Sequence, residues 1–472
     1  MALVVASLLL AVAWAFVTPP FQVPDENGHF AYLQSLVDGG RLPGDGNRSI
    51  FATEQAVAID RSNSDQTALQ LATKMEWNRS AWDAWLKYDR GLGHPGRADG
   101  GGGVPASSNP PLYYLYASLG YRAASGGDLF ARLLASRLVS ALLLIVTVSA
   151  AWLLAGEALR GDRLLQLAAT GLVALAPMIT FLSGAITPDA MLFAAWTLAL
   201  YLGVRILRRG VTAPSAAALL AAVGVAIVVK AASYALLPGA VLVLAVGLYR
   251  LRPPPLRRAA GVIAGALGGL AVTAGVWYVI ARALDRPAAA QVTSASSTAG
   301  TNIRELLSYL WQYYLPRVPG QNAFPTVAHT LPAYDIWFKG VWGAFGWTEV
   351  VFGNPVYVAL LGLSVVVVVA AASELWRGRA TADKAIGAFL ALVTVSLFAG
   401  LHWSDYHLIK SGSNFSQGRY LLPLAGIAGI VLALGIRRLV PRWRPYAVAG
   451  VLGGLFALQL FALALNVTRF YA

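Results

Sequence analysis

Long apolar runs constrain the fold of this chain more than any other sequence feature. Each run has about 17–24 residues, and a helix of that length crosses a hydrocarbon core of about 30 Å at a rise of 1.5 Å per residue. A large soluble α-helical protein would instead alternate buried helices with amphipathic ones, and few amphipathic runs are present. The runs lie at about 2–17, 132–154, 164–183, 188–206, 213–230, 233–249, 259–281, 355–373, 385–402, 420–436 and 446–465. They predict an all-α integral membrane protein with eleven transmembrane helices.

The net charge of +14 could indicate a nucleic-acid ligand, but the positions of the basic residues indicate membrane topology instead. Sixteen of the 36 Lys and Arg residues lie in five short segments between apolar runs: Arg160 and Arg163; Arg205, Arg208 and Arg209; Arg250, Arg252, Arg257 and Arg258; Arg377, Arg379 and Lys384; and Arg437, Arg438, Arg442 and Arg444. Such an excess marks cytoplasmic loops. We therefore expect these loops and the N-terminus inside, the C-terminus outside, and no nucleic-acid partner.

With the basic loops inside, three longer segments face the outside, at about 19–130, 282–354 and 402–419. We interpret residues 1–472 as one transmembrane domain that carries these external loops. The spacing of apolar residues predicts a helix near 30–37 and an interfacial helix near 306–314. Cysteine is absent, which excludes disulfides and thiolate chemistry.

The segment 24–30, directly after the first apolar run, contains the strongest candidates for catalysis. Asp25, Glu26 and His29 lie there at the edge of a low-dielectric region, where the pKa values of such groups are readily shifted. A carboxylate in this position could deprotonate an acceptor hydroxyl as it attacks a carbon centre. Helix capping is the alternative, with Asp25 as the N-cap and Glu26 in the first turn.

Candidate phosphate-binding cations lie at later external helix ends. Arg419 follows Gln417 and precedes Tyr420 at the start of an apolar run, and an arginine fork suits a phosphate. Lys230 closes another run and either binds an anion or extends to the membrane interface. Asp189 begins a third run, as an N-cap or as a functional carboxylate. Dinucleotide fingerprints and P-loops are absent from the sequence, which disfavours a nucleotide donor.

The third external segment contains a further polar group, made of His402, Asp405, His407 and Lys410. The two histidines and the aspartate could bind a metal, although their spacing matches no specific motif. His407 and Lys410 are also candidate substrate-binding residues. If a divalent cation such as Mg²⁺ or Mn²⁺ takes part, Asp25 or Glu26 is the expected ligand.

Four motifs resemble a family of bacterial multi-pass membrane proteins of unknown function related to GT-C glycosyltransferases. They are Pro-Asp-Glu-x-x-His-Phe at 24–30, Asn-Pro-Pro-Leu-Tyr-Tyr at 109–114, Phe-Gly-Trp at 345–347 and Gln-Gly-Arg-Tyr-Leu-Leu-Pro at 417–423. The resemblance implies a GT-C-like bundle, with an essential acid in the first external loop that corresponds to Asp25 or Glu26. It implies that Gln417 and Arg419 lie near a donor phosphate. It also makes Asn109, where relatives would have His, and Trp347 candidate substrate-binding residues.

Together these observations favour an inverting glycosyltransferase in the bacterial cytoplasmic membrane, with its active site facing outside. The expected donor is a polyprenyl-phosphate-linked sugar, and the expected acceptor is a cell-envelope glycan or lipid. In this hypothesis Asp25 is the base, His29 orients it, and Arg419 and Lys230 neutralise the phosphate. A transporter or flippase of lipid-linked saccharides and a non-catalytic scaffold for envelope assembly are the two alternatives.

Overall fold

A computed structural model describes residues 1–75, 77–250, 300–319, 323–324, 331–377, 381–411 and 416–472, together with scattered helical residues between 261 and 282. The described part is helical apart from loops and one hairpin of two-residue strands. This confirms the predicted all-α class. The expected span at 259–281 lies largely outside the described residues.

Seven helical segments in the described ranges are long and apolar enough to cross a membrane. They are 129–158 (α8, Leu129–Ala141, and α9, Leu143–Ala158), 189–209 (α12, Asp189–Arg209), 231–249 (η2, Ala231–Ala235, and α14, Leu236–Tyr249), 354–377 (α19, Asn354–Arg377), 383–410 (in α20, Thr381–Lys410), 418–437 (η4, Gly418–Leu424, and α21, Ala425–Arg437) and 441–471 (η5, Pro441–Trp443, and α22, Arg444–Tyr471). Each coincides with a predicted run. Two shorter apolar helices, α1 (Ala2–Val17) and α13 (Ala213–Ile227), match two further runs.

The predicted run at 164–183 is broken rather than continuous. It consists of α10 (Arg163–Leu175) and α11 (Pro177–Ser183), which meet at an angle of 52°. Pro177 causes the break, because proline has no amide hydrogen to continue the ladder and starts a new helix readily. With this pair the described part contains up to eight spans. The count of eleven therefore stays a prediction.

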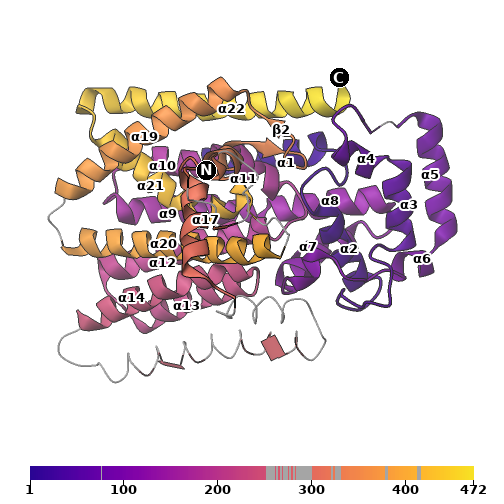
Figure 1. The fold of residues 1–472 in the computed structure, drawn as a ribbon, viewed down its shortest axis with the longest axis horizontal. Helices are drawn as coiled ribbons and strands as arrows, with labels where there is room; N and C mark the ends of the chain where they lie inside the picture. The colour runs from indigo at the N-terminus through magenta and orange to yellow at the C-terminus, as the bar shows by residue number, and fades with distance from the viewer. Residues whose placement is uncertain are drawn as a thin grey trace.

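The spans run side by side in one elongated block, and the helices of the first external segment gather at one end of it (Figure 1). Helix α12 lies at the centre of this block, and most of its side chains are buried against neighbouring helices. By contrast, α19 presents a largely exposed apolar surface, as expected of a helix that faces lipid. The block therefore has an inner core and an outer apolar surface.

The first external segment folds into short helices around an aromatic core. Its elements are α2 (Glu26–Val37), α3 (Thr53–Arg61), α4 (Ser64–Leu69), α5 (Arg79–Leu92), α6 (Pro95–Ala98), η1 (Pro105–Ser108) and α7 (Leu112–Ala123). Glu54 of α3 accepts a hydrogen bond from Arg132 of α8, and both side chains are buried. Because α8 leads into the bundle, this pair joins the external helices to it.

The second external segment contributes α17 (Ile303–Tyr314), η3 (Ala333–Phe338), α18 (Lys339–Trp342) and the strands β1 (Ala344–Phe345) and β2 (Val350–Val351), which pair antiparallel. The predicted helices near 30–37 and 306–314 are thus present as α2 and α17. Helix α17 lies across the direction of the spans (Figure 1). Within the third external segment, α20 extends to Lys410, and η4 carries residues 418–424.

Candidate active site

Asp25 and Arg419 come together although 394 residues separate them in the sequence. Asp25 precedes the first residue of α2 but makes no side-chain capping bond, so the capping interpretation of its carboxylate was wrong. Instead Arg419 Nη2 donates to Asp25 Oδ2, and Arg419 Nη1 donates to the carbonyl of Pro24 at 3.2 Å. Asp25 has φ +64°, a left-handed conformation that is uncommon for a residue other than glycine. The Asp25 carboxylate is thus bonded to a residue of η4 and not to the helix that it precedes.

Asp189 and Lys230 complete a cluster of two carboxylates and two cations. Lys230 Nζ donates to Asp189 Oδ1 at 2.7 Å, and Arg419 Nε lies 3.9 Å from Asp189 Oδ2. Asp189 is the first residue of α12, and Pro188 is the N-cap, so the N-cap interpretation of Asp189 was wrong. Lys230 Nζ also lies 4.9 Å from the centroid of the Tyr420 ring, a cation–π distance. The ends of four helices, α2, α12, η2 and η4, therefore bring opposite charges to one place.

Burial differs sharply within this cluster. The side chains of Asp189 and Arg419 are 2% and 6% exposed, whereas that of Asp25 is 37% exposed. Asp189 Oδ2 and Arg419 Nε have no hydrogen-bond partner among the described residues, and both atoms are buried. Asp25 is thus the carboxylate that an incoming molecule can reach.

His29 is linked to Asn109 through Tyr114. His29 Nδ1 lies 2.8 Å from Tyr114 Oη, and Asn109 Nδ2 donates to the same hydroxyl at 3.2 Å. The ring of Tyr32 stacks on Tyr114 at a centroid distance of 3.6 Å. Burial lowers the pKa of His29 to about 4, although the charge of Asp25 opposes this shift. The imidazole is therefore neutral near pH 7.

The charges around Asp25 keep it ionised. Burial by itself would raise the pKa of Asp25, but the positive charges of Arg419 and Lys230 outweigh burial and lower the pKa below its ordinary value. Asp25 is therefore a carboxylate across the neutral range. While it is bonded to Arg419 it is also a weak proton acceptor.

Glu26 lies next to Asp25 in sequence but belongs to a different, structural cluster. Its Oε1 accepts from Arg137 Nε at 2.7 Å and from the Ile186 amide at 3.2 Å. Its Oε2 accepts from Arg137 Nη2 and from the Phe21 amide at 3.1 Å. Glu26 is fully buried. Each oxygen of Glu26 accepts two hydrogen bonds, and none comes from a residue of the Asp25 cluster. This favours Asp25 over Glu26 as the catalytic candidate.

Arg137 was missed by the sequence reasoning. Besides Glu26, it donates to the carbonyls of Ala15, Thr18 and Pro19. It thereby ties the end of α1 to the first turn of α2. The sequence does contain a sign of this role. Arg132 and Arg137 lie within the first residues of an apolar run, and a charged side chain there requires a partner.

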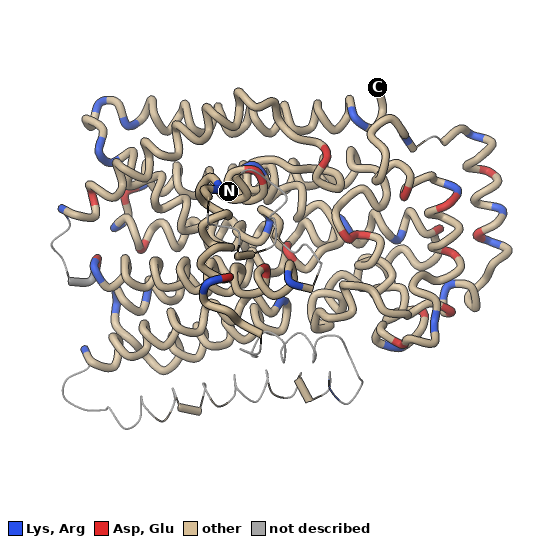
Figure 2. Tube along the Cα trace, viewed as in Figure 1, with Lys and Arg blue, Asp and Glu red and all other residues tan. Residues whose placement is uncertain are grey.

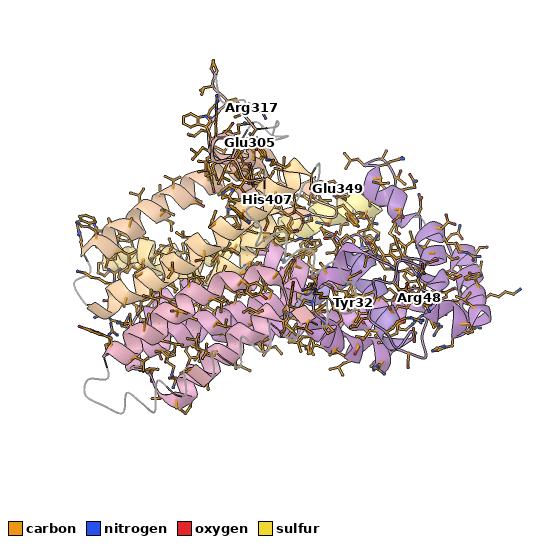
Figure 3. The ribbon with its side chains drawn as sticks, turned by 60° about the horizontal axis from the view of Figure 1, so that its bottom comes forward. Tyr32, Arg48, Glu305, Arg317, Glu349 and His407 are labelled. Atoms are coloured by element: carbon orange, nitrogen blue, oxygen red, sulfur yellow. The ribbon has the colours of Figure 1, made fainter. Side chains whose placement is uncertain are left out.

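The remaining candidates divide between the cluster and other places. Gln417 immediately precedes η4, and its Oε1 is buried with no hydrogen-bond partner in the described ranges. Trp347 Nε1 donates to the carbonyl of Phe21 at 3.0 Å and so fastens the hairpin to the first external segment. Lys410 donates to Glu305 at 2.6 Å, and His407 lies 3.4 Å from Thr301. Figure 3 shows Glu305, a residue of α17, near His407 and away from Tyr32.

In the third external segment, two of the residues considered as metal ligands, His402 and Asp405, form hydrogen bonds with neighbouring residues. His402 contacts Tyr309 through Nδ1 at 2.9 Å and Tyr314 through Nε2 at 2.7 Å. Asp405 accepts from Tyr309 at 2.8 Å and from the Ser416 amide at 3.1 Å. No group of three His, Asp or Glu residues in the described part is arranged to hold a metal. A divalent cation at Asp25, shared with a substrate phosphate, stays a prediction.

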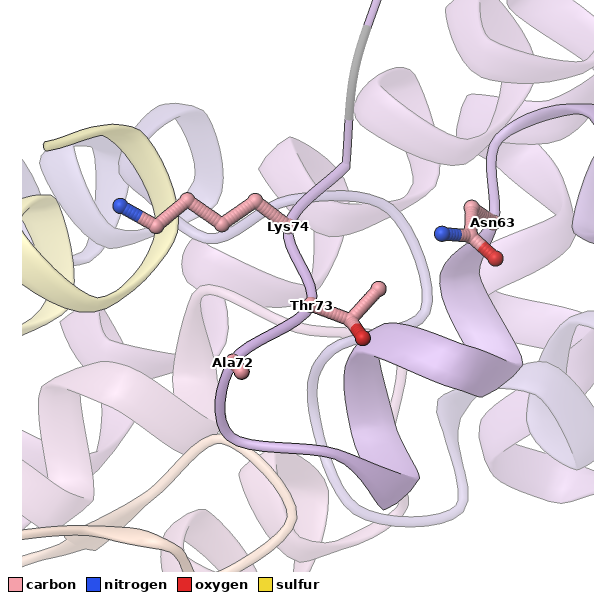
Figure 4. A pocket seen from close by; sticks show the side chains of 4 residues that line it. All are labelled: Asn63, Ala72, Thr73 and Lys74. Carbon is pink, nitrogen blue, oxygen red and sulfur yellow. The ribbon is translucent and has the colours of Figure 1, made fainter.

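A separate open pocket of about 430 Å³ lies in the first external segment (Figure 4). Asn63, Ala72, Thr73 and Lys74 line it. None of these residues belongs to the Asp25 cluster, so the pocket and the cluster are distinct features.

The described helices form a GT-C-like bundle. ArnT from Cupriavidus metallidurans, solved bound to undecaprenyl phosphate, matches 99% of this chain and 77% of its own length, with 13% identity and a TM-score of 0.50. The oligosaccharyltransferase of Archaeoglobus fulgidus, solved in the apo form, matches 98% of the chain at 12% identity and a TM-score of 0.49. The chain spans 55% of that enzyme's length.

The chain belongs to the DUF2142 family of predicted membrane proteins, whose sequence pattern matches residues 8–428. None of the curated proteins matches the chain significantly. The family and the fold confirm the resemblance to a GT-C-related membrane family. They leave the reaction to be argued from the Asp25 cluster.

Proposed function

We propose that the protein is an inverting glycosyltransferase that moves a sugar from a polyprenyl-phosphate donor to a cell-envelope glycan or lipid at the outer face of the bacterial cytoplasmic membrane. One observation carries the proposal. A reachable carboxylate, Asp25, lies beside two cations, Arg419 and Lys230, at the end of the bundle where the external helices gather. A proton acceptor and a phosphate-binding group are the two elements that such a transfer requires.

In the proposed step an acceptor hydroxyl attacks the anomeric carbon of the donor. The new oxygen–carbon bond forms as the bond from that carbon to the phosphate oxygen breaks, and the electron pair of that bond goes to the phosphate. Asp25 takes the hydroxyl proton. The attack comes from the side opposite the phosphate, so the configuration at the carbon inverts.

The charges of the cluster suit this step. With His29 neutral, Asp25 and Asp189 balance Arg419 and Lys230. During the transfer one negative charge disappears from Asp25, which is protonated, and one appears on the departing phosphate. Arg419 and Lys230 are already in place to stabilise that charge, in a site where water is largely excluded.

The lipid-linked donor is supported by the fold and by the surroundings of the cluster. ArnT, which shares the fold, was solved with undecaprenyl phosphate. In this chain the cations lie at the ends of membrane-spanning helices, at residues 230 and 419. A phosphate at the membrane surface with its prenyl chain in the bilayer would meet them there. Gln417 and Tyr420 flank Arg419 and are proposed to contact the same phosphate.

The test is sugar transfer in proteoliposomes with a panel of synthetic polyprenyl-phosphate sugars. Wild type should release polyprenyl phosphate, and Asp25→Asn should lower the rate by about 10²–10⁴-fold, the usual contribution of a general base. Asp83→Asn removes an exposed carboxylate on α5 and is the matched control with wild-type activity. Full activity of Asp25→Asn would exclude Asp25 as the base. A folded wild type that transfers from none of the donors would favour the transporter or scaffold alternatives.

A further inference from the structure

Arg419 presents its two terminal nitrogens to the segment that contains the proposed base. Nη2 is bonded to the Asp25 carboxylate and Nη1 to the Pro24 carbonyl. Binding of a phosphate by both nitrogens of an arginine fork would use these same positions. A donor phosphate and Asp25 therefore compete for one guanidinium.

The two partners differ in how firmly the structure holds them. Arg419 is buried in η4, and the neighbouring Gly418 packs directly against Gly340 of α18. The side chain of Asp25 is 37% exposed. When the pair separates, Asp25 is thus the partner free to move.

We infer that the ion pair between Arg419 and Asp25 is an ionic latch. The donor phosphate opens it by binding Arg419, so Asp25 is free to act as the base only when donor is bound. This inference rests on the proposed function and adds an order to it: donor first, acceptor activation second. Without donor, Asp25 is bonded to a cation and accepts a proton poorly. With donor, the carboxylate is released towards the side where an acceptor can reach it.

The same latch accounts for the end of the cycle. After transfer the phosphate carries one more negative charge and holds Arg419 more strongly, while Asp25 carries the proton from the acceptor. The latch closes again only after the phosphate leaves and Asp25 loses that proton. His29, Asp189, Lys230 and Tyr420 are the other titratable groups that act on Asp25 or Arg419. His29 is hydrogen-bonded to Tyr114, and Asp189 to Lys230.

A closed latch lowers the apparent affinity for the phosphate, because only the open fraction binds. Binding of undecaprenyl phosphate to the full-length protein in nanodiscs tests this in a double-mutant cycle. Asp25→Asn should bind about tenfold more tightly than wild type, within the usual range of coupling between two sites. In the Arg419→Gln background the same substitution should give no gain, because the latch is already absent.

Each outcome decides between explanations. If Asp25→Asn raises the affinity for undecaprenyl phosphate equally in both backgrounds, Asp25 repels the phosphate only through its charge, and the latch is overturned. No increase in affinity in either background would also overturn it. Asp83→Asn is the charge-matched control and should bind like wild type. If Arg419→Gln does not bind undecaprenyl phosphate detectably, the comparison is made in the Arg419→Lys background instead. If Arg419→Gln fails to fold, Arg419→Lys replaces it, and the gain should shrink because lysine has no fork.

Failure of the proposed function is a different result. In that case undecaprenyl phosphate binds to none of the variants, including wild type. Failure of the latch alone leaves wild-type binding intact and changes only the pattern among the variants.

Discussion

At the scale of single residues, Asp25 and Glu26 show that neighbours with the same functional group can have opposite tasks. Glu26 is fully buried, and each of its oxygens accepts two hydrogen bonds. Asp25 is partly exposed and bonded to a single side chain. We assign Glu26 to holding the first turn of α2 against α8, and Asp25 to chemistry.

This difference predicts opposite effects of the two isosteric substitutions. Glu26→Gln leaves the buried charge of Arg137 without its carboxylate, and breaking a buried ion pair in this way costs about 3–5 kcal/mol. The free energy of unfolding in mild denaturant should fall by that amount. Asp25→Asn should change stability much less while it removes transfer. Equal losses of stability for the two variants would contradict the assignment.

At the scale of elements, the position of Arg419 depends on a contact between two glycines. A Cβ on Gly340 of α18 would lie 2.9 Å from Gly418 Cα of η4, closer than real Cβ contacts come. The absence of both side chains lets η4 approach α18 closely. Close packing thus explains why glycine stands at position 418, whereas the charge of the side chain explains why arginine stands at position 419.

Gly418→Ala should therefore displace Arg419 without preventing insertion of the helices. Because a misplacement of about 1 Å can lower a rate by about 10²-fold, we expect a loss of that order in transfer, with weaker binding of undecaprenyl phosphate. The measurement is the proteoliposome assay together with binding in nanodiscs. Gly362→Ala on α19 is the control, since a Cβ there meets no atom within 4 Å. Wild-type activity of Gly418→Ala would show that the close contact does not position Arg419.

At the scale of the whole molecule, the charges separate along the helix axes. Figure 2 shows mainly basic residues, with a few acidic ones, at the end of the bundle opposite the external helices, and mixed charges among those helices. This distribution agrees with the predicted cytoplasmic position of the basic loops. It would place the Asp25 cluster on the outer side, which is a prediction about orientation.

The absence of native cysteine allows a direct test of that orientation. Ser80→Cys on α5 should react with a membrane-impermeant maleimide in intact cells. Ala213→Cys, at the opposite end of the bundle, should react only after permeabilisation, because the predicted topology places it on the cytoplasmic side. Both positions are exposed, and the cysteine-free parent gives the background. The reverse pattern of labelling would move the proposed active site to the inner face.

The sequence by itself determined the class and most of the spans, because a helix in a hydrocarbon core must be long and apolar regardless of its neighbours. It also singled out Asp25, His29, Asp189, Lys230 and Arg419, because charged residues at the ends of such runs are conspicuous. Tertiary structure alone decided how they combine: Arg419 meets Asp25 across 394 residues, and Glu26 turns away to Arg137. Such pairings depend on how distant helices pack, which local periodicity does not encode.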